Sequence, residues 1–381
     1  MCRFIFLLIA LVFLNPAHSE SGLYIDPEIS GLATPLVEVK DVRTRLLLAG
    51  DLGAVLDGAP ILSKLQDWAE RPVKRTTTVF LGDNLYEEGL PNKSSPSFEF
   101  AERPLRAQMN IVEQKKSRGI FVPGNHDWLG EPGKPANDTH CQAGISYRGA
   151  DSIRREANYV NTGMSKRSQM LPHCGCPGPA SVDLDGVRVI VLDTEWWLRE
   201  DKEKPISLQA CPFNTERKVI DQLIHLMNST IDQHVIVVAH HPLVTYGPHG
   251  GVYSLKDKLI FRGLLNRTQD LKSERYRKMI SALKKAFSQY DGIYPLIYAS
   301  GHEHSLQVIK GDKDVDYFLV SGAGTRSRLT DVGHESNTLF AHSTSGFMVL
   351  DYLNDGRVVL HVVEADKEIP SLAIILRKNK Y

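Results

Sequence analysis

The chain has 381 residues, with 45 basic and 45 acidic side chains, and a formal net charge of +0. The length and the 42% hydrophobic content are enough for a full core, in one large domain or two small ones. The charge balance argues against a nucleic-acid partner, and the lack of an acidic block argues against a disordered tail.

The first residues form a targeting segment. Arg3 precedes an apolar run over residues 4–14, and Ala-His-Ser at residues 17–19 offers small side chains to a signal peptidase. This pattern predicts a secretory signal peptide over residues 1–19, with a secreted, periplasmic or extracellular mature protein. An uncleaved anchor or a buried helix is the alternative. A membrane span needs roughly 20 apolar residues, and no other stretch is long enough, so no stable membrane span is expected.

Beyond residue 40, short apolar runs alternate with helical patterns. In these runs apolar and polar residues do not alternate, as expected of strands buried on both faces. The runs cover residues 44–49, 77–81, 120–123, 187–192, 234–239 and 294–299. The helical patterns cover residues 59–71, 104–116, 214–227 and 274–287, the third with Asn214 as its N-cap. Strands that alternate with helices predict a layered α/β fold.

Later strands have no helices between them. They cover residues 315–320, 346–352 and 357–363 and indicate a second sheet packed on the first. Two inserts rich in Gly and Pro, at 129–179 and 244–269, are predicted to be surface loops. The simplest organisation is one domain over residues 40–365.

The cysteines fit an exported protein. Cys2 leaves with the signal peptide, and Cys141, Cys174, Cys176 and Cys211 remain. In an oxidising compartment these cysteines are expected to pair, with three possible connectivities. Cys174 and Cys176 are too close to pair comfortably, so each is expected to reach one of the others. A zinc site is weakly supported, because no second Cys-x-x-Cys occurs, and unpaired buried thiols remain an alternative.

Metal-ligand residue types follow several of the predicted strands. The motifs are Gly-Asp-Leu-Gly at residues 50–53, Gly-Asp-Asn-Leu-Tyr at 82–86, Gly-Asn-His-Asp at 124–127, His-His-Pro at 240–242 and Gly-His-Glu-His at 301–304. The carboxyl ends of strands in α/β sheets meet at one edge, where ligands bind. Asp, Asn and His at that edge suit zinc, iron or manganese, and glycines allow close backbone approach.

These motifs resemble those of the calcineurin-like metallophosphoesterases and, more narrowly, of the purple (tartrate-resistant) acid phosphatases. The wider family usually has a histidine two residues after its first aspartate, where this chain has Gly53. Tyr86 instead stands where purple acid phosphatases have a tyrosinate ligand. His249 and the stretch 319–324 also resemble that family. The resemblance spans about residues 46–324 and implies two packed mixed β-sheets flanked by helices, the αββα metallophosphoesterase sandwich.

The resemblance also implies a ligand set. Asp51, Tyr86 and His304 would hold a first metal ion, usually ferric iron in that family, as suits a hard tyrosinate donor. Asn125, His240 and His302 would hold a second ion, which is zinc, iron or manganese, and Asp83 would bridge both. A packed aromatic at a strand end is the alternative role for Tyr86.

The expected reaction is attack on phosphorus by a hydroxide held between the two metals. His126 is the candidate general acid for the leaving alkoxide, oriented by Asp127, and structural support of the loop is the alternative role. His249 would bind the phosphate or share the role of acid. His241 either supports a ligand or faces the substrate, or else it is packed in the core, and His334 and His342 are assigned no role.

The favoured function is therefore hydrolysis of phosphate monoesters, on a phosphorylated small molecule or a phosphoprotein. A phosphodiesterase or nucleotide hydrolase could use the same metal centre. The alternative of another class is a non-catalytic secreted metal-binding protein on a retired phosphatase fold. Such a protein would be expected to have lost ligands, and here every ligand position is filled.

Overall fold

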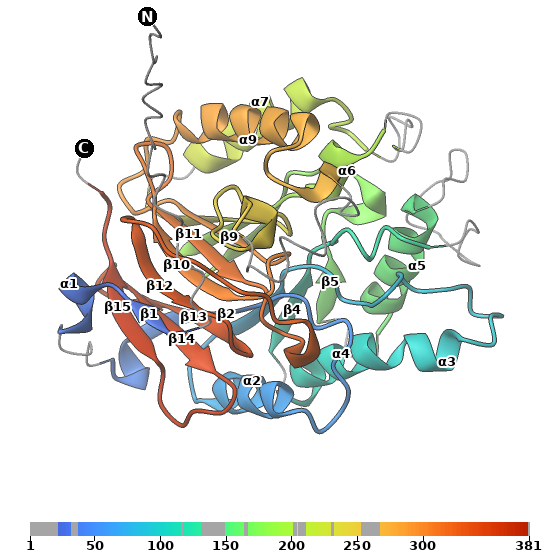
Figure 1. Ribbon diagram of the computed structural model, residues 1–381, viewed down its shortest axis with the longest axis horizontal. Coiled ribbons are helices and arrows are strands. Elements are labelled where there is room, and N and C mark those ends of the chain that lie inside the picture. Colours follow the sequence, from blue (N-terminus) through green and yellow to red (C-terminus); the bar gives the residue numbers. More distant parts are fainter. Residues whose placement is uncertain are drawn as a thin grey trace, which may run out of the picture.

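The computed structural model describes residues 22–31, 37–115, 117–130, 149–163, 167–200, 204, 211–229, 232–252 and 267–379. Two β-sheets lie face to face at the centre of the molecule, and helices cover the outer faces (Figure 1). This is the expected αββα sandwich. The predicted signal peptide over residues 1–19 lies outside the described residues, as does Cys141.

One sheet has the strand order β1-β12-β10-β11-β9-β8-β7-β6 and the other β15-β14-β13-β2-β3-β4-β5. The first sheet consists of β1 (Tyr24–Ile25), β12 (Thr338–His342), β10 (Leu306–Lys310), β11 (Tyr317–Ser321), β9 (Ile297–Ser300), β8 (His234–Val238), β7 (Val187–Val191) and β6 (Ala180–Leu184). The second consists of β15 (Leu372–Leu376), β14 (Val358–Glu364), β13 (Gly346–Leu353), β2 (Val42–Ala49), β3 (Thr76–Phe80), β4 (Arg118–Phe121) and β5 (Ser168–Met170). Both sheets are mixed: β2, β3, β4 and β5 run parallel, as do β7, β8, β9 and β11.

Alternate residues of each central strand serve two different hydrophobic clusters. In β2, Leu46 and Leu48 join the cluster between the sheets, where Val189 of β7 and Ile236 of β8 also lie. Leu47, from the same strand, joins the cluster under the helices. Because successive side chains point to opposite faces, a strand buried on both faces must be apolar throughout. This explains why these runs show no alternation of apolar and polar residues.

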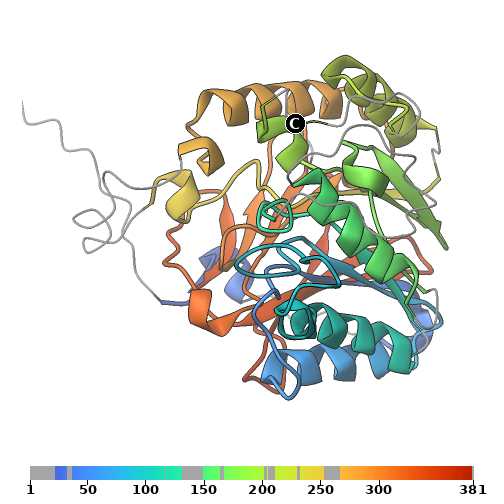
Figure 2. The same cartoon turned by 90° about the vertical axis from the view of Figure 1, so that its right-hand side faces the viewer.

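The helices form the two outer layers. They are α1 (Pro27–Ser30), α2 (Pro60–Glu70), α3 (Phe98–Ala101), α4 (Arg103–Lys115), α5 (Ala150–Asn161), α6 (Glu195–Leu198), α7 (Glu216–Asn228) and α9 (Glu274–Phe287). Figures 1 and 2 show α2 and α4 together on one side of the molecule and α7 and α9 on the other. The helix α2 packs on β2 and β3, and α7 packs on β7 and α9. Residues such as Leu65 of α2 and Leu223 of α7 are fully buried there.

Three sequence expectations were wrong in detail. The later strands do not form a second sheet of their own, because β11 pairs with β9 in one sheet and β13 pairs with β2 in the other. The N-cap of α7 is Thr215, whose hydroxyl accepts a hydrogen bond from the backbone N–H of Lys218, and not Asn214. The predicted surface loop at 129–179 contains the helix α5 and the strand β5, and α5 is mostly buried against β5. The Gly and Pro residues of this insert lie outside α5, so its average composition hid a helix with a buried face.

Disulfide formation agrees with the predicted oxidising compartment. Cys176 and Cys211 are joined by a disulfide, and Cys174 is also disulfide-bonded. The cysteines of this part of the chain therefore do not form a zinc site or a set of free thiols. In the part of the chain that the structure describes, no helix is both long and apolar enough to cross a membrane.

Candidate metal centre

The candidate site lies where β2, β3, β8 and β9 end, at the carboxyl edge of both sheets. Asp51, Asp83 and His302 follow their strands with positive φ angles of 61°, 51° and 68°. Residues other than glycine rarely adopt this left-handed backbone conformation, and those that do are often found at functional sites. The backbone therefore turns sharply at each of these positions and directs the side chain into a common space.

Two glycines allow the strand ends to approach one another. A Cβ atom on Gly82 would lie 2.6 Å from His240 Nδ1, and one on Gly124 would lie 2.2 Å from the backbone nitrogen of Asp83. Neither distance leaves room for a side chain. The expectation that glycines precede the ligands to permit close approach is therefore met at both positions.

Asp51, Tyr86 and His304 form one triangle of donor atoms. The phenol oxygen of Tyr86 lies 2.8 Å from Asp51 Oδ1 and 3.2 Å from His304 Nε2. Asp51 Oδ1 lies 3.3 Å from the same nitrogen of His304. Ligands that bind one cation at about 2.1 Å and at right angles are about 3 Å apart. The triangle therefore has the spacing of neighbouring ligands around a single metal ion.

Gly53 makes room for the tyrosine in this triangle. A Cβ at Gly53 would lie 2.5 Å from the carbonyl carbon of Leu85, and the Gly53 carbonyl accepts a hydrogen bond of 3.1 Å from the backbone N–H of Tyr86. A histidine at residue 53 would displace the backbone that carries Tyr86. The absence of the wider family's histidine and the presence of the tyrosine are thus one structural feature.

Asn125, His240 and His302 form a second triangle. Asn125 Oδ1 lies 2.9 Å from His240 Nε2 and 3.0 Å from His302 Nδ1, and these two nitrogens are 3.3 Å apart. The far nitrogen of each ring faces a backbone carbonyl, that of Leu81 for His240 at 2.8 Å and that of Gln269 for His302 at 3.3 Å. Such partners orient a histidine ligand and leave its other nitrogen for a metal.

Asp83 lies between the two triangles. Its Oδ1 is 3.4 Å from His240 Nε2, and it has a donor atom within 4.8 Å of donors from both Asp51 and His240. The backbone N–H of His126 also donates to Asp83 Oδ1, at 2.9 Å. Asp83 thus has its carboxylate within reach of both triangles, as expected of a bridging ligand.

The electrostatics of the donor set suit cations. Burial opposes the charge on His240, but Asp83 and Asp51 raise its pKa to about 10. Burial, and then the same two carboxylates, raise the pKa of Tyr86 well above its usual value. The phenol therefore stays protonated beside carboxylates alone, and a strongly charged cation would be needed to ionise it. Buried acids, imidazole nitrogens and an amide oxygen fit a transition-metal pair better than calcium.

His126 stands at the edge of the first triangle. Its ring meets the Tyr86 ring edge-on, with centroids 4.7 Å apart, and its Nδ1 lies 2.7 Å from the carbonyl oxygen of Glu87. The expectation that Asp127 orients this ring was wrong. The Asp127 carboxylate is buried and accepts hydrogen bonds from backbone N–H groups of Gly124, Asn84 and Leu85 instead. These hydrogen bonds of Asp127 hold together the ends of the two strands that carry Asp83 and Asn125.

His249 stands on the other side, beside the second triangle. Its ring centroid lies 4.1 Å from that of His302, and its Nδ1 is 3.1 Å from Asp270 Oδ1. Burial disfavours the charged ring, but the hydrogen bond to Asp270 and the charge of Glu303 hold its pKa above the usual value. His126 and His249 therefore flank the donor set from two directions, and each has one ring nitrogen engaged by the protein.

His241 is buried behind the second triangle. Its donor atom lies within 4.8 Å of those of His240 and His302. Both of its ring nitrogens are already engaged, Nδ1 by the Thr194 hydroxyl at 2.8 Å and Nε2 by Gln269 Oε1 at 2.7 Å. His241 is therefore a support for the ligands and does not face a substrate.

Several supporting residues were missed by sequence reasoning. Glu303 is fully buried, and its Oε2 accepts a 3.0 Å hydrogen bond from the backbone N–H of His249, which ties that loop to the strand end. The Arg328 guanidinium lies 3.9 Å from the centroid of the Tyr86 ring, and its carbonyl oxygen is 2.7 Å from His304 Nδ1. Of these two residues, only Glu303 could have been found from the sequence, because it lies between the predicted ligands His302 and His304.

Comparisons with known proteins agree with this geometry. The family model of the calcineurin-like phosphoesterases matches residues 44–306. Purple acid phosphatase 17 of Arabidopsis thaliana is 23% identical over 297 residues, which cover 75% of this chain and 70% of that protein.

Solved structures share the fold. The purple acid phosphatase PPD1 from yellow lupin (Lupinus luteus) superposes with a TM-score of 0.54 at 12% identity, over 88% of this chain and 54% of that one. GAP50, described as the anchor in the inner membrane complex of Plasmodium, superposes with a TM-score of 0.51 at 18% identity, over 89% and 90% of the two chains.

Proposed function

The chain belongs to the calcineurin-like phosphoesterase family, and on that premise we propose that it is a secreted hydrolase of phosphate monoesters with a two-metal centre like that of the purple acid phosphatases. The observation that carries the proposal is the pair of donor triangles with Asp83 between them. The catalytic unit proposed is a single domain over residues 40–365, and the disulfide between Cys176 and Cys211 supports an exported protein.

The proposed ligands follow the two triangles. Asp51, Tyr86 and His304 would hold iron, and Asn125, His240 and His302 would hold zinc, iron or manganese, with Asp83 shared. When bound, such a metal pair activates water near neutral or acid pH and neutralises charge on the phosphate oxygens.

The protein's own groups would position the substrate and move protons. We propose that His126 donates a proton to the leaving oxygen, because its Nδ1 is held by the Glu87 carbonyl and its Nε2 remains available. His249, held by Asp270, would place its free ring nitrogen toward the phosphate. Asp127 would keep the strand ends at fixed spacing through its bonds to Gly124 and Asn84.

A non-catalytic role is the alternative of another class. GAP50 has a similar fold and is described as an anchor, so the fold alone does not decide between a hydrolase and a binding protein. The complete donor set favours the hydrolase, because a retired site would not be expected to retain the spacing of both triangles.

The deciding experiment is metal analysis of the purified protein, together with hydrolysis of an aryl phosphate monoester and the matching diester between pH 4 and 8. We expect two metal ions per chain and faster turnover of the monoester. Faster turnover of the diester would instead support a phosphodiesterase or nucleotide hydrolase. No turnover of either ester by the metal-loaded protein would overturn the enzymatic proposal.

The proposed iron has its own test. Tyrosinate bound to ferric iron should give a visible absorption band, and Tyr86→Phe should abolish it because the donor oxygen is removed. A colourless, fully active wild-type protein that contains only zinc or manganese would contradict the iron assignment and would leave the family assignment intact.

A further inference from the structure

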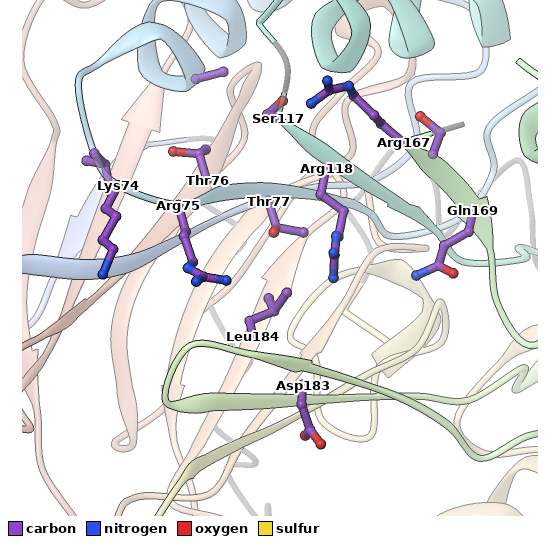
Figure 3. Close-up of a pocket in the computed structure, with 13 residues that line it drawn as sticks. Lys74, Arg75, Thr76, Thr77, Ser117, Arg118, Arg167, Gln169, Asp183 and Leu184 are labelled. Carbon is purple, nitrogen blue, oxygen red and sulfur yellow. The ribbon is translucent and has the colours of Figure 1, made fainter. Parts of the chain in front are cut away.

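A second cluster of charged residues lies at the opposite edge of the parallel strands. A cavity of about 610 Å³ opens at the start of β3, β4 and β5 and beside the end of β6. Lys74, Arg75, Arg118 and Arg167 line it (Figure 3). The eight residues from Thr76 to Asp83 would span roughly 20 Å in an extended strand, so this cavity is separate from the metal centre.

Three of the cations project in the same direction. Figure 3 shows the side chains of Lys74, Arg75 and Arg118 side by side, with Thr77 between the two arginines, whereas Arg167 points toward Ser117. The arrangement follows from strand register, because Arg118 of β4 pairs with Thr77 of β3. Neighbouring parallel strands are about 4.8 Å apart, so this register holds the two arginines close together despite their repulsion.

The nearby carboxylates leave most of this positive charge unbalanced. Asp183 also lines the cavity, but it pairs with Arg188 through contacts of 2.7 and 2.9 Å. Asp185 accepts hydrogen bonds of 2.8 and 2.9 Å from Arg43, and lies farther from Arg75 and Lys74, at 3.5 and 3.8 Å.

Arg118 has no carboxylate partner among the residues that the structure describes. Lys74 and Arg75 share one carboxylate that is already bound to Arg43, so the cavity keeps an excess of positive charge, which favours an anionic ligand.

A hydroxyl group lies on the same face as the arginines. Figure 3 shows Thr77 between Arg75 and Arg118, whereas Thr76 points to the other face of the strand, as expected from the alternation of side chains along a strand. A ligand with several oxygen acceptors would meet the Thr77 hydroxyl together with the guanidinium groups.

We propose that this cavity binds a small polyanion that carries two or more phosphate groups. Guanidinium groups pair with phosphate oxygens through two parallel hydrogen bonds, and hydroxyls add further donors. Arg75, Arg118 and Lys74 together match more charge than one phosphate carries. The cavity lies at the opposite end of the strands from the metal centre. It would therefore bind its ligand without the metals and independently of the proposed hydrolysis.

Isothermal titration of the metal-loaded protein with tripolyphosphate tests the proposal. We expect the wild type to bind one equivalent in this cavity, in addition to any bound at the metal centre. The variant Arg75→Gln/Arg118→Gln should weaken the cavity binding at least about tenfold, since each charged hydrogen bond contributes appreciably. Its hydrolysis of an aryl phosphate should be unchanged, which also shows that the variant is folded.

The matched control removes two positive charges elsewhere. Arg217 on α7 and Lys278 on α9 are exposed, with side chains 91% and 72% accessible. Arg217→Gln/Lys278→Gln should bind tripolyphosphate like the wild type. Equal binding by all three proteins, or equal weakening in both variants, would overturn the proposal.

Vesicles that contain a bisphosphorylated inositol lipid separate two sources of the same chemistry. Sedimentation of the wild type, lost in Arg75→Gln/Arg118→Gln, would assign the phosphate groups to a lipid headgroup. Tripolyphosphate binding without sedimentation would assign them to a free small molecule.

Discussion

At the carboxyl ends of the central strands, Asp51 and Asp83 are almost fully buried and lie among histidines. At the amino ends, Arg75 and Arg118 are exposed beside an open cavity. Strand β3 connects the two ends, with Arg75 immediately before it and Asp83 shortly after it. One end has donors at the spacing of metal ligands, and the other has a row of cations beside an open cavity.

This difference follows from how each end is built. The carboxyl ends are closed by glycines and left-handed residues that bring several strands to one point. The amino ends of β3 and β4 keep the spacing of adjacent strands, so their side chains stay parallel and do not converge. Converging donors suit a small cation, whereas parallel cations suit an extended anion. Three substitutions test whether the two ends are as independent as this comparison implies.

The largest effect is expected at the shared carboxylate. Asp83→Ala should remove both metals and reduce hydrolysis to the background rate, because Asp83 lies between the two triangles and would be shared by both ions. Metal analysis and aryl phosphate turnover measure this loss. Asp185→Ala, at the amino end, is the matched control and should keep its metals and its activity. Full metal content in Asp83→Ala would contradict the bridging role.

A smaller loss is expected from the proposed proton donor. His126→Ala should keep both metals and lose activity by roughly 10²–10⁴-fold, the usual contribution of a positioned general acid. An aryl ester should suffer less than an alkyl phosphate, because nitrophenolate leaves without protonation. Equal losses on the two substrates would point to His249 as the acid, and loss of metal would assign His126 a structural role.

The smallest effect is expected on the free energy of unfolding, and it comes from His234 at the amino end of β8. Burial lowers the pKa of His234 to about 4, and the charge of Arg43 adds to this shift. In the unfolded chain the same ring has a pKa of about 6.5, so the unfolded state binds more protons between these values. Stability is therefore lost as the pH falls from about 6.5 to 4, by up to about 3 kcal/mol.

His234→Gln should flatten this part of the stability profile and leave hydrolysis unchanged. Urea unfolding at several pH values measures the change in the free energy of unfolding. His225→Gln, on the exposed face of α7, is the matched control and should keep the wild-type slope. An unchanged slope in His234→Gln would mean that other groups cause any loss of stability in acid.

The sequence predicted the strands that carry the site because their physical signals are local. A strand buried on both faces must be continuously apolar, so the run at 44–49 identified β2 and the run at 234–239 identified β8. The helix over residues 274–287 was predicted with the bounds that the structure has. The motifs after the strands then placed Asp51, Asn125 and His302 at one edge, where the structure brings them together.

Other features depended on contacts between residues far apart in the chain. The helix α5 was missed because loop composition surrounds it, although tertiary packing buries it beside β5. Asp127 was assigned to the ring of the preceding residue, His126. Its carboxylate instead accepts hydrogen bonds from the backbone N–H of Gly124, three residues earlier, and, across the strand ends, from that of Asn84. No local pattern distinguishes these two arrangements of a Gly-Asn-His-Asp motif.

The amino acid sequence by itself determined where along the chain the central strands lie, the residue types at their ends and the glycines that precede them. The tertiary structure decided which donors share a triangle, that Gly53 makes room for Tyr86, and that both nitrogens of His241 are engaged. It also brought Arg75 and Arg118 together, through the register of β3 and β4. The reason is physical: a strand's burial is encoded along the chain, but distances of about 3 Å between side chains depend on how separate strands pack.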